Sequence, residues 1–221
     1  MAAFSVVRSR PAGARLTVVT SAGLLEGRGH REVAAAAILG GADALQLRAP
    51  ELPDRDLLPL AAELAAACRA AGTLFIVNDR LEVAVAAGAD GVHLGQGDTP
   101  DRARAALPPA MVLGVSVETP EQARQAARFG ATYLGVTVWP TATKPGARPV
   151  GLNGLRAVCA ATTLPVVGIG GINAGNTAQV QAAGARGIAV VSAVGSAGNM
   201  AAATRALAAA LERPRDTGAT A

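Results

Sequence analysis

A three-residue motif that begins with Gly-Ala recurs four times along the chain. Its copies start at Gly41, Gly88, Gly130 and Gly184, so they are 47, 42 and 54 residues apart. Each copy follows an alanine-rich run typical of a helix and precedes a short apolar run typical of a strand. Glycine at this position supplies the left-handed conformation that ends a helix. Because each interval has room for two strand–helix units, the repeat predicts eight of them.

The apolar runs are mostly continuous rather than alternating, which is typical of parallel strands covered on both faces. Eight such strands close a barrel. The predicted strands are Leu16–Thr20, Ala44–Leu47, Leu74–Asn78, Gly91–Leu94, Val112–Val115, Tyr133–Gly135, Val166–Ile169 and Ile188–Val191. Helices are predicted between and after them, including Asp54–Ala70, Pro120–Phe129 and Asn199–Leu211.

We therefore predict an α/β protein with a single (β/α)8 TIM barrel over residues 16–212. A flexible segment is expected at 1–15 and a disordered tail at 213–221. The alternative is an open, doubly wound sheet, which the regular repeat and the lack of a glycine-rich loop after the first strand disfavour.

Composition limits the class of partner. Aromatic residues make up 2% of the chain and the net charge is +4, so a nucleic-acid surface is poorly supplied and a small anionic molecule fits better. No apolar run reaches the roughly 20 residues of a membrane span. Cys68 and Cys159 lie in alanine-rich segments without metal-ligand spacing and are predicted to be packing thiols in a reducing, cytoplasmic compartment.

Polar residues cluster where the predicted strands end, which is where TIM barrels carry their active sites. The seventh strand runs into Gly168-Ile169-Gly170-Gly171, and Ser192 follows the eighth. Small residues let a phosphate group approach backbone N–H groups, and these two loops are the usual phosphate position of this fold. The structural alternative is a tight turn that serves packing alone.

Two carboxylates, Asp79 and Asp98, follow the neighbouring third and fourth strands. Mg²⁺ is often held by one or two carboxylates together with phosphate oxygens and water. The alternative, weighed equally, is that each aspartate caps a helix, one starting near Arg80 and the other near Pro100. Arg48 and Lys144 add the positive charge that a diphosphate clamp requires.

A long loop from Thr137 to Val150 carries Thr141, Thr143 and Lys144, and we expect it to act as a lid or an anion contact. Three other residues are not expected to take part in the chemistry. His93 is expected to face the core or a helix, and Trp139 to pack at the mouth of the barrel. His30 is expected at a helix start with no evident role.

Six motifs in order resemble those of the thiamine-phosphate synthase family, across about residues 16–211. They are Gln46-Leu47-Arg48, Val77-Asn78-Asp79, Gly95-Gln96-Gly97-Asp98, Gly114-Val115-Ser116, Pro140-Thr141-Ala142-Thr143-Lys144 and Gly168-Ile169-Gly170-Gly171-Ile172. The resemblance implies condensation of 4-amino-2-methyl-5-(diphosphooxymethyl)pyrimidine with thiazole phosphate, giving thiamine phosphate and diphosphate. Such an enzyme needs Mg²⁺ but no general base, because the thiazole nitrogen captures a pyrimidine methylene cation.

The resemblance also implies residue roles, with Arg48, Ser116 and Lys144 as the catalytic residues. Mg²⁺ would be held by Asp79 and Asp98. The pyrimidine diphosphate would be held by Gln46, Arg48, Asn78, Ser116 and Lys144. The thiazole phosphate would be held by Thr141, Thr143, Gly170, Gly171, Val191 and Ser192.

The chain departs from the family pattern at two places. Arg48 is followed by Ala49-Pro50 where the family usually has Glu-Lys, so Pro50 stands at the position of a diphosphate-binding lysine. Arg55 or Arg80 would have to supply the missing positive charge. Val136-Thr137 stands where the family generally has Gly-Pro or similar.

Three other functions remain open: a related thiazole tautomerase, a non-catalytic binder of thiamine precursors, and another phosphate-handling barrel isomerase. The tautomerase would leave Asp79, Asp98 and Lys144 idle. The other isomerase would need an acid–base pair that the sequence does not offer. The expected partners are small phosphorylated molecules, not nucleic acid or membrane, and a homo-oligomer is compatible with the sequence.

Overall fold

The computed structural model describes residues 14–21, 27–95, 100–143 and 146–212. The expected flexible segment at 1–15 lies outside these ranges except for residues 14 and 15, and the expected tail at 213–221 lies outside them entirely. The strands are β1 (Leu16–Val19), β2 (Ala44–Leu47), β3 (Leu74–Asn78), β4 (Gly91–Leu94), β5 (Val112–Ser116), β6 (Tyr133–Thr137), β7 (Val166–Ile169) and β8 (Gly187–Val190). The helices are α1 (His30–Leu39), α2 (Asp54–Ala71), α3 (Leu81–Ala86), α4 (Pro100–Ala106), α5 (Pro120–Arg128), α6 (Gly151–Ala160), α7 (Thr177–Ala182), α8 (Ser192–Gly195) and α9 (Met200–Glu212).

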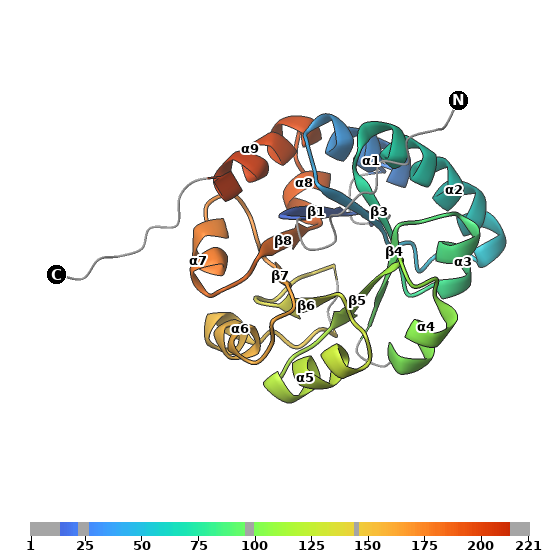
Figure 1. The fold of residues 1–221 in the computed structure, drawn as a ribbon. Helices are drawn as coiled ribbons and strands as arrows, with labels where there is room; N and C mark the ends of the chain where they lie inside the picture. The colour runs from blue at the N-terminus through green and yellow to red at the C-terminus, as the bar shows by residue number, and fades with distance from the viewer. Residues whose placement is uncertain (1–13, 22–26, 96–99, 144–145, 213–221) are drawn as a thin grey trace, which may run out of the picture.

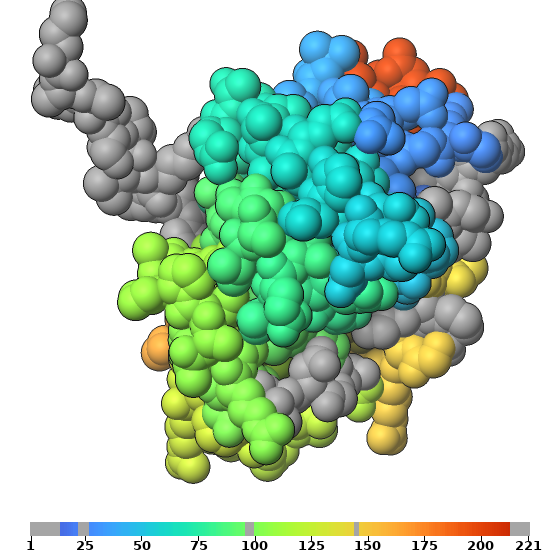
Figure 2. All heavy atoms as spheres, turned by 90° about the vertical axis from the view of Figure 1, so that its right-hand side faces the viewer, coloured from blue at the N-terminus to red at the C-terminus, as the bar shows by residue number. Residues whose placement is uncertain are grey.

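The strands form a closed parallel barrel in chain order, with β8 returning to pair with β1. The helices ring the outside, as Figure 1 shows. One face of this outer layer is formed by α2, α3 and α4 (Figure 2). The predicted TIM barrel is confirmed, and the predicted strands differ from the observed ones by two residues or fewer at either end. The described residues contain no helix long and apolar enough to cross a membrane.

The Gly-Ala repeat ends helices as predicted and also fixes the strands that follow. Gly41, Gly88, Gly130 and Gly184 have φ angles of 82°, 64°, 80° and 102°. In three copies the third residue binds a backbone N–H of a neighbouring strand. Asp43 accepts from Leu16 at 2.9 Å, Asp90 from Phe75 at 2.8 Å and Thr132 from Leu113 at 3.0 Å. In these three copies the repeat therefore couples the helix end to the strand register.

Buried apolar residues form two clusters, one on each face of the strands. The larger cluster contains outward-facing residues such as Val18, Leu45 and Val77, which pack beneath the helices. The smaller one fills the barrel interior with Val19, Ala44, Leu74, Ile76, Val112, Tyr133, Val167 and Ala189. Because successive side chains of a strand point to opposite faces, the interior residues continue into the polar residues at the strand ends.

Glycines on β5 and β6 make room for two rings inside the barrel. A Cβ atom at Gly114 would lie 2.2 Å from the Tyr133 ring, and one at Gly135 would lie 2.9 Å from the His93 ring. The two rings contact each other, with centroids 5.4 Å apart. The small residues on these strands thus set the shape of the barrel interior.

We expect Gly114→Ala to destabilise the protein by about 1–3 kcal/mol, because the added methyl group must displace the buried Tyr133 ring. Chemical denaturation followed by circular dichroism measures the change. Gly146→Ala is the matched control, since a Cβ there has no atom within 4 Å. Its free energy of unfolding should stay within about 0.5 kcal/mol of the parent. Equal stability of the two variants would contradict the packing described.

The cysteines lie in the helical layer. Cys68 is buried in α2, and Cys159 is half-buried in α6, where its side chain packs near Gly184. Burial raises the pKa of Cys159 to about 11, so this thiol stays protonated at neutral pH. Its protonated state fits a packing role rather than a nucleophilic one.

Candidate active site

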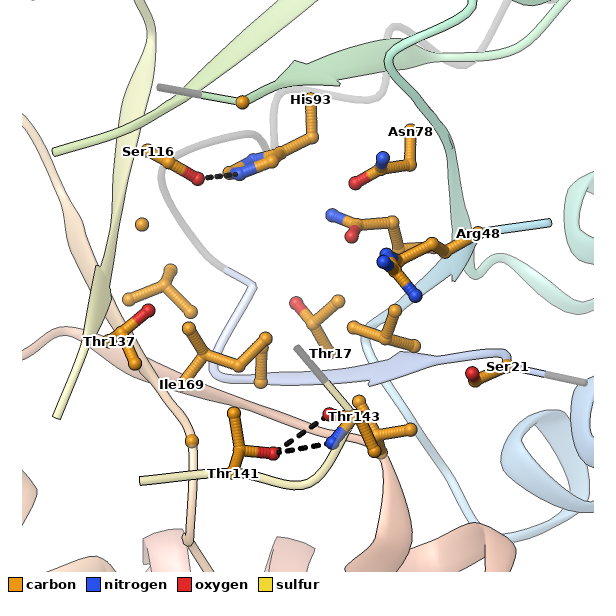
Figure 3. A pocket seen from close by; sticks show the side chains of 18 of the residues that line it. Thr17, Ser21, Arg48, Asn78, His93, Ser116, Thr137, Thr141, Thr143 and Ile169 are labelled. Atoms are coloured by element: carbon orange, nitrogen blue, oxygen red, sulfur yellow. Dashed lines mark hydrogen bonds between the residues drawn. The ribbon is translucent and has the colours of Figure 1, made fainter. Parts of the chain in front are cut away.

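A pocket opens at the carboxyl ends of the strands. Its apolar floor comes from the barrel interior and its polar rim from the strand ends and the loops after them. The lining residues are Thr17, Val19, Ser21, Gln46, Arg48, Asn78, Asp79, His93, Gly95, Ser116, Tyr133, Gly135, Thr137, Thr141, Thr143, Val167, Ile169, Gly170, Ala189 and Val191. Figure 3 shows Arg48 and Asn78 on one side and Thr141 and Thr143 on another.

The fold brings most of the sequence-predicted site residues into this pocket. Gly171 and Ser192 are exposed chain neighbours of lining residues and do not themselves line it. Asp98 and Lys144 lie outside the described residues. The predicted residues that line the pocket are Gln46, Arg48, Asn78, Asp79, Ser116, Thr141, Thr143, Gly170 and Val191.

Asp79 adopts an unusual backbone conformation at the end of β3. Its φ angle is 63°, and it is the one described residue other than glycine with a positive φ. Its N–H donates to the His93 carbonyl at 2.8 Å, and its Oδ2 accepts from Asn78 Nδ2 at 2.5 Å. The N-cap of α3 is Arg80, with no side-chain capping bond. The capping alternative is therefore wrong for Asp79, which lines the pocket.

The donor set near Asp79 suits Mg²⁺ better than a metal that needs a full protein cage. The described residues contain no group of three or more His, Cys, Asp or Glu side chains that could hold a metal ion. A carboxylate in an open pocket, next to the Asn78 amide, leaves coordination positions for phosphate oxygens and water, which is the usual environment of Mg²⁺.

Arg48 is the one arginine or lysine among the described lining residues. It follows β2 and is half-buried, and its N–H donates to Thr20 Oγ1 at 3.2 Å. Its guanidinium group lies at the pocket, near Asn78 (Figure 3). A half-buried arginine at this place can form paired hydrogen bonds to phosphate oxygens.

His93 faces the barrel interior, where its ring contacts the core residue Tyr133, in agreement with the predicted core orientation, but its place at the site was missed. It lines the pocket, with Nδ1 2.8 Å from the Tyr133 hydroxyl and Nε2 3.0 Å from Ser116 Oγ (Figure 3). The sequence did not reveal the pocket face, because strands covered on both faces lack the in–out alternation that reveals direction. In the structure His93 shares its face with Gly95, two residues further on, which also lines the pocket.

Tyr133 completes a chain of polar groups below Ser116. Burial raises the pKa of Tyr133, and a hydrogen bond from the Gln46 side chain opposes that shift. The phenol is therefore protonated at neutral pH. Its oxygen lies 2.8 Å from His93 Nδ1, and His93 Nε2 lies 3.0 Å from Ser116 Oγ, so hydrogen bonds connect the barrel interior to the serine at the pocket.

The glycine loop after β7 packs closely against the loop after β6. Gly170 and Gly171 have φ angles of 90° and 65°, and a Cβ at Gly170 would lie 2.6 Å from the Trp139 carbonyl oxygen. Trp139 is half-buried against the larger apolar cluster beneath the helices, and its atoms also contact the glycine loop after β7. Thr141 and Thr143 bind each other at 2.8 Å through their hydroxyls. The two loops thus place hydroxyl and backbone groups on one side of the pocket.

The comparisons with known proteins agree with this geometry. The family model for thiamine monophosphate synthase matches residues 16–194. The chain is 49% identical to the thiamine-phosphate synthase of Moorella thermoacetica, over 90% of this chain and 97% of that protein. It is 50% identical to the enzyme of Chloroflexus aurantiacus, over 87% and 90%. The thiamine phosphate pyrophosphorylase structure from Pyrococcus furiosus superposes with a TM-score of 0.83 at 37% identity, covering 91% of this chain and 96% of that one.

The chain belongs to the thiamine monophosphate synthase family. The family and function indicated by the six motifs are confirmed. The tautomerase, binder and isomerase alternatives find no support in these similarities.

The two departures from the thiamine monophosphate synthase pattern have different surroundings. Val136 is fully buried beneath the helices, whereas Thr137 lines the pocket. Pro50 is exposed in the turn after β2.

Neither proposed substitute for the missing lysine lines the described pocket. Arg80 pairs with Asp54, and the largely exposed Arg55 lies 3.8 Å from Asp56. Among the described residues, no second arginine or lysine lines the pocket to share the charge of Arg48.

Proposed function

We propose that this pocket joins the pyrimidine diphosphate to thiazole phosphate with the help of Mg²⁺, releasing diphosphate. The observation that carries the proposal is that Arg48 and Asn78 lie on one side of a pocket whose other side carries Thr141 and Thr143. Asp79 and Gly170, their chain neighbours and loop partners, also line this pocket. One side suits a diphosphate group and the other a phosphate monoester. The two-sided arrangement suits a reaction between two phosphorylated substrates.

The polar chain below Ser116 orients the pyrimidine. With the His93 proton on Nε2, this atom donates to Ser116, and the serine hydroxyl keeps its own proton for an acceptor nitrogen of the substrate. The chain therefore serves binding and orientation, in agreement with a reaction that needs no general base.

The leaving diphosphate is stabilised by fixed positive charge. Arg48 offsets the negative charge that grows as the carbon–oxygen bond breaks, and Lys144, outside the described residues, is proposed to do the same. Mg²⁺ held by Asp79 and Asp98 would supply further charge compensation at this group.

The apolar floor protects the reacting carbon. Val19, Val167, Ile169 and Ala189 line the deep part of the pocket and limit the water that can reach the methylene cation. The thiazole nitrogen captures this cation, forming the new carbon–nitrogen bond. The electron pair of the broken bond leaves with diphosphate, so the step needs no other reactant.

The purified protein, given both precursors and Mg²⁺, should form thiamine phosphate and diphosphate in equal amounts. Excess chelator should abolish product formation, and added Mg²⁺ should restore it. Chromatography of thiamine phosphate and a coupled diphosphate assay measure the two products. The synthase proposal fails if neither product forms although thiazole phosphate binds, and the metal proposal fails if chelation has no effect.

A further inference from the structure

A buried histidine outside the pocket connects α1 to the two turns at the ends of β1 and β2. His30 is 8% exposed, with Nδ1 2.8 Å from Thr20 Oγ1 and Nε2 2.9 Å from Glu51 Oε1. Thr20 is fully buried, whereas the Glu51 side chain is 43% exposed. These three side chains, Thr20, His30 and Glu51, form a relay beside the site.

Thr20 holds the end of β2 at two points. Its backbone N–H donates to the Gln46 carbonyl at 2.9 Å, and its hydroxyl oxygen accepts from the Arg48 N–H at 3.2 Å. The hydroxyl therefore supplies the acceptor for Arg48 just beyond the last residue of β1. Gln46 and Arg48 both line the pocket, so the position of Thr20 controls two residues of the site.

Counting hydrogens gives the relay a direction. The Glu51 carboxylate only accepts, so His30 Nε2 carries a proton and donates it. The Thr20 oxygen already accepts from Arg48, and its single proton can be donated to His30 Nδ1. In this arrangement the imidazole, the carboxylate and the hydroxyl each have a hydrogen-bond partner within the relay.

The relay also closes a ring around the turn that follows β2. Glu51 lies three residues after Arg48, and the Leu52 N–H donates to the Ala49 carbonyl at 3.2 Å within the same turn. His30 thus binds the far end of the turn through Glu51 and its near end through Thr20. This is the turn in which Pro50 replaces the lysine usual in the family.

We propose that His30 is a positioning residue that holds Arg48 in place for the diphosphate group. The inference rests on the proposed function, because it takes Arg48 to bind that group. A relay held at both ends keeps the Arg48 backbone fixed when the charged side chain binds its ligand. A fixed Arg48 backbone matters more in this chain, because Pro50 stands in the turn where the family usually has a second positive charge, a lysine.

The test compares His30→Ala, His30→Asn and Glu51→Ala by steady-state kinetics with each substrate varied. His30→Ala should raise the KM for the pyrimidine diphosphate about tenfold, as loss of a ligand-orienting partner typically does. It should change the KM for thiazole phosphate less than about twofold, since the relay does not contact that side. His30→Asn keeps an amide near the Nδ1 position and should recover most of the loss. Glu51→Ala should give a smaller change of the same kind.

Arg31→Gln is the matched control. Arg31 is next to His30 on α1 and forms an exposed ion pair with Glu63 at 2.7 Å, away from the pocket. Its kinetics should match the parent. A purely structural role of His30 would lower the Tm and the active fraction while leaving both KM values unchanged, and that result would overturn the proposal, as would equal changes in both KM values. If His30→Ala does not fold, His30→Asn and Glu51→Ala carry the comparison.

Failure of the proposed function is distinguishable from failure of this inference. If the parent protein forms no thiamine phosphate, the synthase proposal is wrong, and titration calorimetry with inorganic diphosphate and Mg²⁺ then tests the relay alone. About tenfold weaker diphosphate binding by His30→Ala than by the parent would still support it, and equal binding would overturn it.

Discussion

Asp79→Asn is expected to lower kcat by about 10²–10³-fold, the usual effect of removing one group that stabilises charge in the transition state. The substitution removes a negative charge and one proposed Mg²⁺ ligand. Asparagine tolerates the positive φ of 63° at this position, so the fold should be preserved. Asp79→Ala would add backbone strain and is the less informative change. Initial rates measured over a range of Mg²⁺ concentrations should show a raised half-saturating concentration.

The control for Asp79→Asn is Asp56→Asn. Asp56 lies in the first turn of α2, and its carboxylate is largely exposed and does not line the pocket. This variant should retain the parent kcat and the parent dependence on Mg²⁺. Parent-like activity of Asp79→Asn would remove Asp79 from the proposed metal site.

Arg48→Ala is expected to lower kcat/KM for the pyrimidine diphosphate by about 10²–10³-fold, because it removes the charge that faces the leaving group. The effect should be large, since the described pocket holds no other arginine or lysine. Arg48→Lys should recover only part of the loss, because lysine lacks the paired donors of a guanidinium group. Steady-state kinetics with both substrates measure these changes.

Arg55→Ala provides the charge control for Arg48. Arg55 is an exposed residue of α2 paired with Asp56, so its removal changes the net charge by the same amount without touching the pocket. Its kinetics should match the parent. A similar loss in Arg55→Ala and Arg48→Ala would point to a general effect of charge and would contradict a specific clamp.

Much of the site was predictable because its residues lie at or next to the carboxyl ends of strands. Gln46, Asn78 and Ser116 end their strands or lie within one residue of the end, and the carboxyl ends of all eight strands meet at one opening. A residue at such an end reaches the pocket whatever the details of packing. The same reasoning could not decide whether Asp79 capped a helix, because both roles follow a strand end, and the structure places the N-cap of α3 at Arg80 instead.

The sequence alone determined the barrel, through local effects. Glycine in the left-handed conformation ended four helices, and in three of them the third residue of the motif bound the backbone of a neighbouring strand. The strand ends then placed the polar motifs at one opening.

Only the tertiary structure decided which way His93 faces and which residues His30 joins. Both strand faces are covered by apolar groups, so sequence pattern does not distinguish inside from outside. The partners of His93 are 23 and 40 residues away, and Glu51 is 21 residues from His30. Such contacts arise from barrel closure and helix docking, which no local pattern records.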